Sequence, residues 1–252
     1  MAIHPFLAMT AAEIRTVSDF PPKIAWMACH FSPYCTGLSN LPRELPPGSL
    51  LILDDITPIH GHDPEEIGGQ LTERVEKLEC SGVLLDFQRP DCEETAALAK
   101  HLAGTLPCPV GVSEPYAGEL DCPVFLPPAP PDVPLVEYIA PWSGREVWLE
   151  MALDGEVISL TEQGAEAASL PWGEMLAGGF AQERLHCHYR IETDDNSARF
   201  TLWRTREDLE GLLEDAEKFG VTTAVGLYQE LHGFAPQSLP LKGKAASRRA
   251  DG

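Results

Sequence analysis

The sequence predicts an α/β fold, a single (β/α)8 barrel of the TIM type with extra β-hairpins in its C-terminal half. The chain has 252 residues, which is about the usual size of one such barrel. Two apolar runs, 49–55 and 82–87, flank a helix-forming segment, and this order favours a parallel sheet. We expect one domain at 1–234 and a disordered polar tail at 235–252.

The charge and the cysteines exclude several classes of function. The formal net charge is −21, whereas nucleic acids and anionic membranes bind basic surfaces. No apolar run is as long as a membrane span, and the N-terminus lacks the pattern of a secretory signal. The seven cysteines form no Cys-x-x-Cys pair, which favours free thiols in the cytoplasm over a zinc site. We expect no metal or cofactor; a neutral sugar or small molecule, a cation or a basic protein stay open as partners.

The N-terminal part contains one expected strand and one long loop. We interpret residues 1–22 as a lead-in that ends at two prolines. Residues 23–31 should form the first strand, with His30 near its end. The loop at 32–48 is long for a barrel, which is typical of a loop that covers a site.

Two strands with acidic ends follow. The run 49–55 ends in Asp54 and Asp55, and the run 82–87 contains Asp86. The helix between them begins well, because Asp63 can act as N-cap before a proline and two glutamates. Since parallel strands end on one face of a barrel, we expect these acids to meet at its mouth.

The middle of the chain contains two shorter strands. They are expected at 108–112 and 122–126, and the first ends at Glu114 and Tyr116. Residues 127–134 include five prolines and predict a stiff, irregular connection. The number of strands between this connection and residue 185 stays open.

Two hairpins are expected in the C-terminal half. The first turns at Asp154-Gly155 and pairs 156–160 with the strand at 146–152. The second joins 186–190 to 199–203 through an Asp-Asp-Asn turn. These hairpins are additions to the regular barrel units.

Two local features lie around these hairpins. Trp172 to Phe180 is interpreted as a short helix. His186 and His188 share one face of an exposed hairpin, and we do not expect them to bind a metal.

The chain ends with a helix and a last strand. Thr205 and Asp208 resemble a capping box, and the strand at 221–228 is followed by Glu230, with Tyr228 at its end. The apolar face of the helix is expected at Leu209, Leu212, Leu213, Ala216 and Phe219.

The stretch 81–90, SGVLLDFQRP, places Asp86 and Gln88 on the same side of a strand. It resembles a strand signature of the chitinase-like family 18 glycoside hydrolases, Asp-Gly-x-Asp-x-Asp-x-Glu followed by an aromatic residue and proline. The matching residues are Gly82, Asp86, Phe87 and Pro90.

The stretch departs from the signature where the chemistry would be. The first two aspartates are replaced by Ser81 and Leu84, and the glutamate falls on Gln88. A second stretch, 186–234, resembles the last part of barrels in the branch that trims spore or cell-wall glycan. Here Tyr228 stands where the family usually has tryptophan.

The resemblance implies a specific chemistry. Enzymes of the family use a protonated glutamate as general acid, and the aspartate two residues earlier orients the acetamido group of the substrate. An amide at Gln88 cannot donate that proton, although it can form hydrogen bonds to a sugar. The acids that could replace it from other strand ends are Asp54, Asp55, Glu114, Glu150 and Glu230.

Three functions stay open at this point: a glycan-binding barrel without hydrolase activity, an active glycosidase with a relocated acid, or a non-catalytic interaction protein. An open mouth lined by aromatic residues would favour the first, with Tyr34, Trp142 and the tyrosines at 116 and 228 as candidates. The expected ligand-binding set is Asp54, Asp55, Glu114, Tyr116, Tyr228 and Glu230, beside Asp86 and Gln88 as the degenerate catalytic pair.

Overall fold

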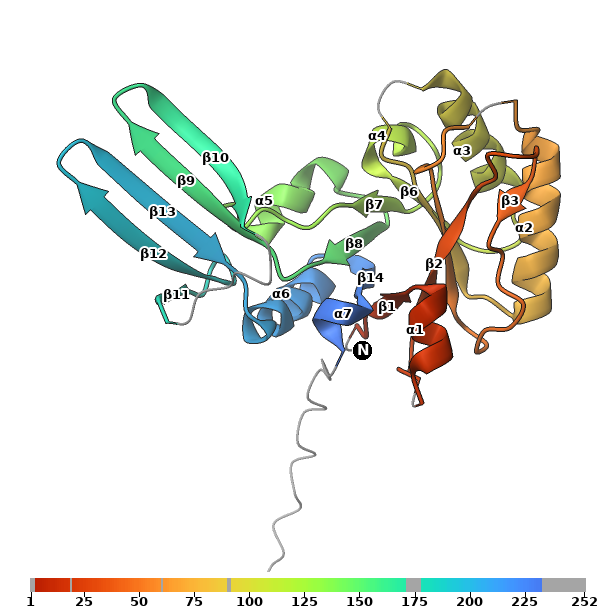
Figure 1. Ribbon diagram of the computed structural model, residues 1–252, viewed down its shortest axis with the longest axis horizontal. Helices are drawn as coiled ribbons and strands as arrows, with labels where there is room; N and C mark the ends of the chain where they lie inside the picture. The colour runs from red at the N-terminus through yellow and green to blue at the C-terminus, as the bar shows by residue number, and fades with distance from the viewer. Residues whose placement is uncertain (1–2, 19, 60, 90–91, 171–177, 233–252) are drawn as a thin grey trace, which may run out of the picture.

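The structure is a computed structural model that describes residues 3–18, 20–59, 61–89, 92–170 and 178–232. Its main sheet has nine strands, of which eight are parallel and close into a barrel, as the sequence predicts (Figure 1). Closure is complete because β1 pairs with both β14 and β2. The parallel strands are β1 (Phe6–Met9), β2 (Ile24–Phe31), β4 (Leu50–Asp54), β5 (Gly82–Asp86), β6 (Val110–Ser113), β7 (Val124–Leu126), β8 (Val147–Met151) and β14 (Val221–Leu227); β3 (Leu38–Ser39) is antiparallel to β2.

The helices around the barrel are uneven in length. The long ones are α2 (Pro64–Leu78), α3 (Glu93–Thr105) and α6 (Arg206–Lys218). The short ones are α1 (Ala11–Thr16), α4 (Glu114–Ala117), α5 (Leu135–Ile139), the 3-10 helix η1 (Ala140–Trp142) and α7 (Tyr228–Leu231). Within the described residues, no helix has the length and apolar character needed to cross a membrane.

Helix α2 sets the position of the two strands on either side of it. The Asp63 carboxylate accepts the N–H of Glu65 at 3.1 Å, which confirms the predicted N-cap. The apolar face of α2 is buried, and each such side chain contributes about 1.5–3 kcal/mol. The consequence is a register in which Asp54 of β4 lies beside Asp86 of β5.

The interpretation of residues 1–22 as a lead-in was wrong. They contain β1, whose four residues are all buried, and α1, which begins with a capping box between Thr10 and Glu13. A four-residue strand that is buried on both faces shows no alternation, so its pattern is too short to stand out. Barrel closure makes it necessary, because β1 fills the gap between β14 and β2.

A second, antiparallel sheet is inserted between β8 and α6 and projects away from the barrel (Figure 1). Its strand order is β10-β9-β13-β12-β11. The predicted hairpin at 186–203 is confirmed as β12 and β13. The strands are β9 (Gly155–Thr161), β10 (Gly164–Leu170), β11 (Phe180–Gln182), β12 (Cys187–Asp194) and β13 (Ser197–Trp203).

The other expected hairpin was wrong in its pairing. Strand β9 pairs with β10 and β13 rather than with β8. Gly155 lies inside β9, and a Cβ atom there would be 2.7 Å from the carbonyl oxygen of Leu202. This glycine is therefore required by a close approach of two backbones, not by a turn.

Two expectations fall at or beyond the edge of the described residues. Of the short helix expected from Trp172 to Phe180, residues 172–177 lie outside the described part, while Phe180 begins β11. The polar tail at 235–252 also lies outside it.

Contacts with α6 hold the second sheet against the barrel. His186 Nε2 lies 2.8 Å from Asp215 Oδ2, and His188 Nδ1 lies 2.8 Å from Asp208 Oδ2. Asp208 also completes the predicted capping box at the start of α6, which is confirmed. The predicted apolar face of α6 is buried except for Phe219, which is 44% exposed.

Replacing Gly155 tests the close approach of β9 and β13. We expect Gly155→Ala to lower the free energy of unfolding by about 1–3 kcal/mol, because its methyl group overlaps a carbonyl oxygen. Gly69→Ala is the control, since a Cβ at this exposed position of α2 meets nothing within 4 Å. It should stabilise the protein by about 0.5–1 kcal/mol. Equal effects in urea unfolding would contradict the role assigned to Gly155.

Candidate functional site

Three carboxyl groups meet at the mouth of the barrel. Asp54 and Asp86 are register partners at the carboxyl ends of β4 and β5, and Glu150 comes from β8. All three line a cavity of about 480 Å³ that enters the barrel. Its apolar wall is formed by Ala8, Met27, Ile52, Leu84, Phe125, Val225 and Leu227.

Asp86 and Gln88 form a pair at this mouth. The side chain of Gln88 follows the strand on the same side as Asp86, and its Nε2 donates a hydrogen bond to Asp86 Oδ1. Burial raises the pKa of Asp86, and the nearby charges of Asp54 and Asp55 raise it further. The hydrogen bond from Gln88 lowers it. The structure thus brings together the two residues that the sequence assigns to the degenerate catalytic pair.

Asp54 connects the mouth to β2. Its Oδ2 lies 3.5 Å from His30 Nδ1, and its Oδ1 accepts the N–H of Ile56 at 3.1 Å. His30 Nε2 lies 2.9 Å from the amide nitrogen of Asn40. His30 Nδ1 is buried and faces Asp54, without a hydrogen-bond partner among the described residues. Burial raises the pKa of Asp54, while the hydrogen bond from Ile56 and the contact with His30 oppose this.

Asp55 holds the loop that carries Gln88. Its Oδ1 accepts the N–H of Gln88 at 2.9 Å, and its Oδ2 accepts the N–H of Arg89 at 3.0 Å. Arg89 Nε donates in return to the Asp55 carbonyl oxygen at 2.7 Å. Both carboxylate oxygens of Asp55 therefore bind backbone, which gives this residue a positioning role beside the cavity that it lines.

A second set of contacts supports the same loop from β6 and α4. Ser113 Oγ accepts the N–H of Phe87 at 2.8 Å and donates to the Leu85 carbonyl oxygen at 2.8 Å. The Tyr116 hydroxyl donates to the Arg89 carbonyl oxygen, and its ring packs edge-on against Phe87. The loop is thus fixed on both sides, and Tyr116 lies outside the cavity lining.

Among the acids at the mouth, Glu150 has the pKa that is raised the most. Burial in the apolar cavity, followed by the nearby charges of Asp86, Glu230 and Asp154, raises its pKa to about 7. At neutral pH this carboxyl group is therefore close to half protonated. It can both donate and accept a hydrogen bond, which Gln88 can also do but without transferring a proton.

The other expected ligand-binding residues lie outside the cavity lining. Glu114 is exposed at the start of α4, and Tyr228 packs against His232 with the ring centroids 5.3 Å apart. Glu230 is buried, and its Oε2 accepts the N–H of Leu153 at 2.8 Å. Tyr34 is 95% exposed on the loop after β2, and the ring of Trp142 lies beneath Arg145. Their role in binding a ligand stays a prediction.

The apolar wall is the part of the site that sequence reasoning missed. Phe125, which is buried, is its aromatic member. Met27 and Leu227 look like any core residue in the sequence, because a strand of a barrel is apolar on both faces. Ser113 could have been identified from the sequence, because it is a polar residue at the end of an apolar strand. In the described part of the chain, no group of three or more His, Cys, Asp or Glu residues could hold a metal ion.

The sequence matches no family model and no curated protein. Solved structures nevertheless share the fold. The chitinase-like agglutinin of Robinia pseudoacacia has a TM-score of 0.56 at 12% identity, over 87% of this chain and 93% of its own. The spore cortex-lytic enzyme SleL of Bacillus cereus has a TM-score of 0.55 at 11% identity, over 89% of this chain and 70% of its own.

A third structure of the same fold contains a sugar. The GH18 chitinase of Cycas revoluta, in complex with (GlcNAc)3, has a TM-score of 0.52 at 11% identity, over 88% of this chain and 94% of its own. At these identities the likeness concerns the fold. The chain therefore shares its barrel fold with these structures, as the sequence predicts.

The raised pKa of Glu150 predicts a pH dependence of stability. Because the folded protein holds this proton more tightly than the unfolded chain, stability falls as the pH rises from about 4.5 to about 7. We expect the free energy of unfolding of Glu150→Gln to fall by about 2 kcal/mol less than that of wild type over this pH range. Urea unfolding at pH 5 and pH 8 measures it, with Glu114→Gln as the exposed control. A pH dependence that is identical in wild type and Glu150→Gln would refute the assignment.

Proposed function

We propose that the mouth cavity binds a glycan containing N-acetylglucosamine and does not cleave it by the family 18 route. The observation that carries this proposal is the hydrogen-bonded pair of Asp86 and Gln88 in an accessible cavity. The pair ends the fourth parallel strand of the barrel, and the resemblance puts the substrate-orienting aspartate and the acid at these two positions. The shared fold of chitinases and of a chitinase-like agglutinin supports it.

The pair has the chemistry to bind but not to protonate a sugar. Asp86 can accept a hydrogen bond from the N–H of an acetamido group. Gln88 donates through Nε2 to Asp86, and its Oε1 can accept a hydrogen bond from a sugar hydroxyl. Because an amide has no proton to transfer at neutral pH, the general acid of the family 18 mechanism is missing.

The shape of the mouth favours a ligand over a purely structural barrel. Its volume of about 480 Å³ falls within the range of small-molecule sites, about 300–1,000 Å³. The apolar wall, with Phe125 and Leu84, offers a surface for the methyl group of an acetamido substituent or the apolar face of a sugar ring. Asp86 and Glu150 at the same cavity supply the polar contacts that orient such a ligand.

A glutamine in a barrel of this fold is compatible with sugar binding. A mutant of the Cycas revoluta chitinase, in which one of two substitutions replaces glutamate by glutamine, is in complex with (GlcNAc)4. Its TM-score with this chain is 0.54 at 12% identity. This supports a binding protein that carries Gln88 as its native residue.

Glu150 favours a second candidate function, which is hydrolysis with a relocated acid. It lines the same cavity as Asp86, and burial raises its pKa to about 7, as general acids near neutral pH require. In this function the Glu150 carboxyl donates its proton to the glycosidic oxygen as the bond to the sugar carbon breaks, and water completes the hydrolysis. Gln88 would then only position the substrate.

We also propose that the protein is located in the cytoplasm. All seven cysteines are free, and Cys35 is exposed. Free thiols persist in a reducing compartment, whereas secreted proteins usually pair them. The proposed ligand is therefore a glycan or glycan fragment that occurs inside the cell.

Isothermal titration with (GlcNAc)3 tests the binding function. We expect wild-type protein to bind the sugar and Asp86→Ala to lose about 10-fold or more in affinity, since a hydrogen bond to a charged group is removed. Glu119→Ala is the matched control, because Glu119 is an exposed acid that lies outside the cavity lining. An unchanged affinity in Asp86→Ala would reject the mouth as the binding site.

A chromogenic chito-oligosaccharide separates binding from hydrolysis. We expect no turnover by wild type and a gain of turnover in Gln88→Glu, because the missing acid contributes about 10²–10⁴-fold. Wild-type turnover that disappears in Glu150→Gln would establish the second candidate instead. If no variant turns over substrate and none binds (GlcNAc)3, the interaction-protein interpretation replaces both.

A further inference from the structure

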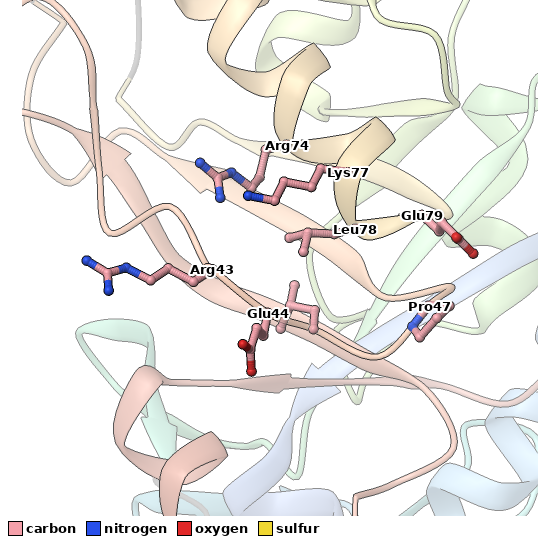
Figure 2. A pocket seen from close by; sticks show the side chains of 8 residues that line it. Arg43, Glu44, Pro47, Arg74, Lys77, Leu78 and Glu79 are labelled. Atoms are coloured by element: carbon pink, nitrogen blue, oxygen red, sulfur yellow. The ribbon is translucent and has the colours of Figure 1, made fainter.

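A second pocket lies at the opposite end of the barrel from the mouth. It is formed by the loop before β4 and the last turns of α2, near the amino ends of β4 and β5 (Figure 2). Its volume is about 680 Å³, which is also within the range of small-molecule sites. Arg43, Arg74 and Lys77 line it, together with Glu44 and Glu79.

The three basic groups of this pocket form no ion pair with a described carboxylate. Within the part of the chain that the structure describes, no carboxylate oxygen lies within 4.0 Å of a side-chain nitrogen of Arg43, Arg74 or Lys77. In Figure 2 the side chains of Arg74 and Lys77 extend from α2 in the same direction, whereas the guanidinium group of Arg43 points away from both. In the same view the carboxylates of Glu44 and Glu79 are directed elsewhere.

One side-chain nitrogen of Arg74 has no hydrogen-bond partner among the described residues. Its Nη1 donates to the Pro42 carbonyl oxygen at 3.0 Å, which anchors the guanidinium group to the loop. Its Nε is buried and has no hydrogen-bond partner among the described residues. An unpaired buried donor costs free energy.

The helix dipole explains only part of this cluster. Lys77 lies in the last turn of α2, where a cation is favoured. Arg43 comes from a loop and gains nothing from the helix, although it lines the same pocket. Three cations therefore line one pocket of a protein with a formal net charge of −21.

We propose that this pocket binds a phosphorylated small molecule through its phosphate group. Two arginine forks and a lysine match an anion of more than one charge, and a phosphate ester carries about −1.5 to −2 at neutral pH, whereas a carboxylate carries less. A nucleic acid does not fit, because the acidic protein repels a long polyanion. The site lies away from Asp86 and Gln88, so it does not depend on the function of the mouth.

Isothermal titration of the full chain with pyrophosphate tests the proposal. We expect binding by wild type and a loss of about 10-fold in Arg43→Gln and in Arg74→Gln, since each removes one charge-assisted hydrogen bond. Lys100→Gln is the control, because Lys100 is an exposed cation on α3 that does not line the pocket. Arg43 is exposed and makes no side-chain hydrogen bond or ion pair with the described residues, so its variant remains informative if Arg74→Gln does not fold.

Two further titrations complete the test. ADP and glucose 1-phosphate should compete with pyrophosphate, and the tighter one identifies the carrier of the phosphate group. The proposal is overturned if wild type does not bind pyrophosphate, if Lys100→Gln weakens it as much as Arg43→Gln does, or if citrate binds as tightly as pyrophosphate.

Discussion

The carboxylate of Asp55 accepts the backbone N–H groups of Gln88 and Arg89 at 2.9 and 3.0 Å, and these two hydrogen bonds fix the segment that carries the site. Asp55 is only 2% exposed, and both of its side-chain oxygens accept backbone N–H groups, as a buried polar group requires. Ser113 and Tyr116 hold the same segment from the other side. The position of Gln88 beside Asp86 follows from this support, because the strand itself ends at Asp86.

The rest of the mouth is shaped by the cost of burying carboxyl groups together. Asp54, Asp86 and Glu150 line one apolar cavity, and burial is the largest cause of the raised pKa of each. Because the pKa of Glu150 is raised to about 7, this carboxyl group is only partly charged at neutral pH, and it can both donate and accept a hydrogen bond. A neutral sugar suits this environment. The pocket at the base has the opposite character, with its three basic groups, and the barrel thus offers two chemically distinct ends.

The sequence predicts the regular parts of this architecture because local signals are strong there. The pairing of β4, α2 and β5, and the side shared by Asp86 and Gln88, follow from capping residues and from the strand period. Strand β1 and the partner of β9 could not be predicted, since barrel closure and the backbone approach at Gly155 are tertiary constraints. In the site, sequence shows which acids end a strand but not where they point. Glu230 accepts the backbone N–H of Leu153 and Glu150 lines the cavity, although the sequence predicts both at strand ends.

The most direct test of this account is a crystal structure of the protein grown with (GlcNAc)3. The account predicts sugar density in the mouth cavity, with the acetamido group within hydrogen-bond distance of Asp86 and Gln88 and its methyl group against the wall that contains Phe125. It also predicts an intact glycosidic bond next to Gln88. Sugar bound elsewhere on the surface, or an empty mouth at saturating ligand, would contradict the central claim that this cavity is a glycan-binding site.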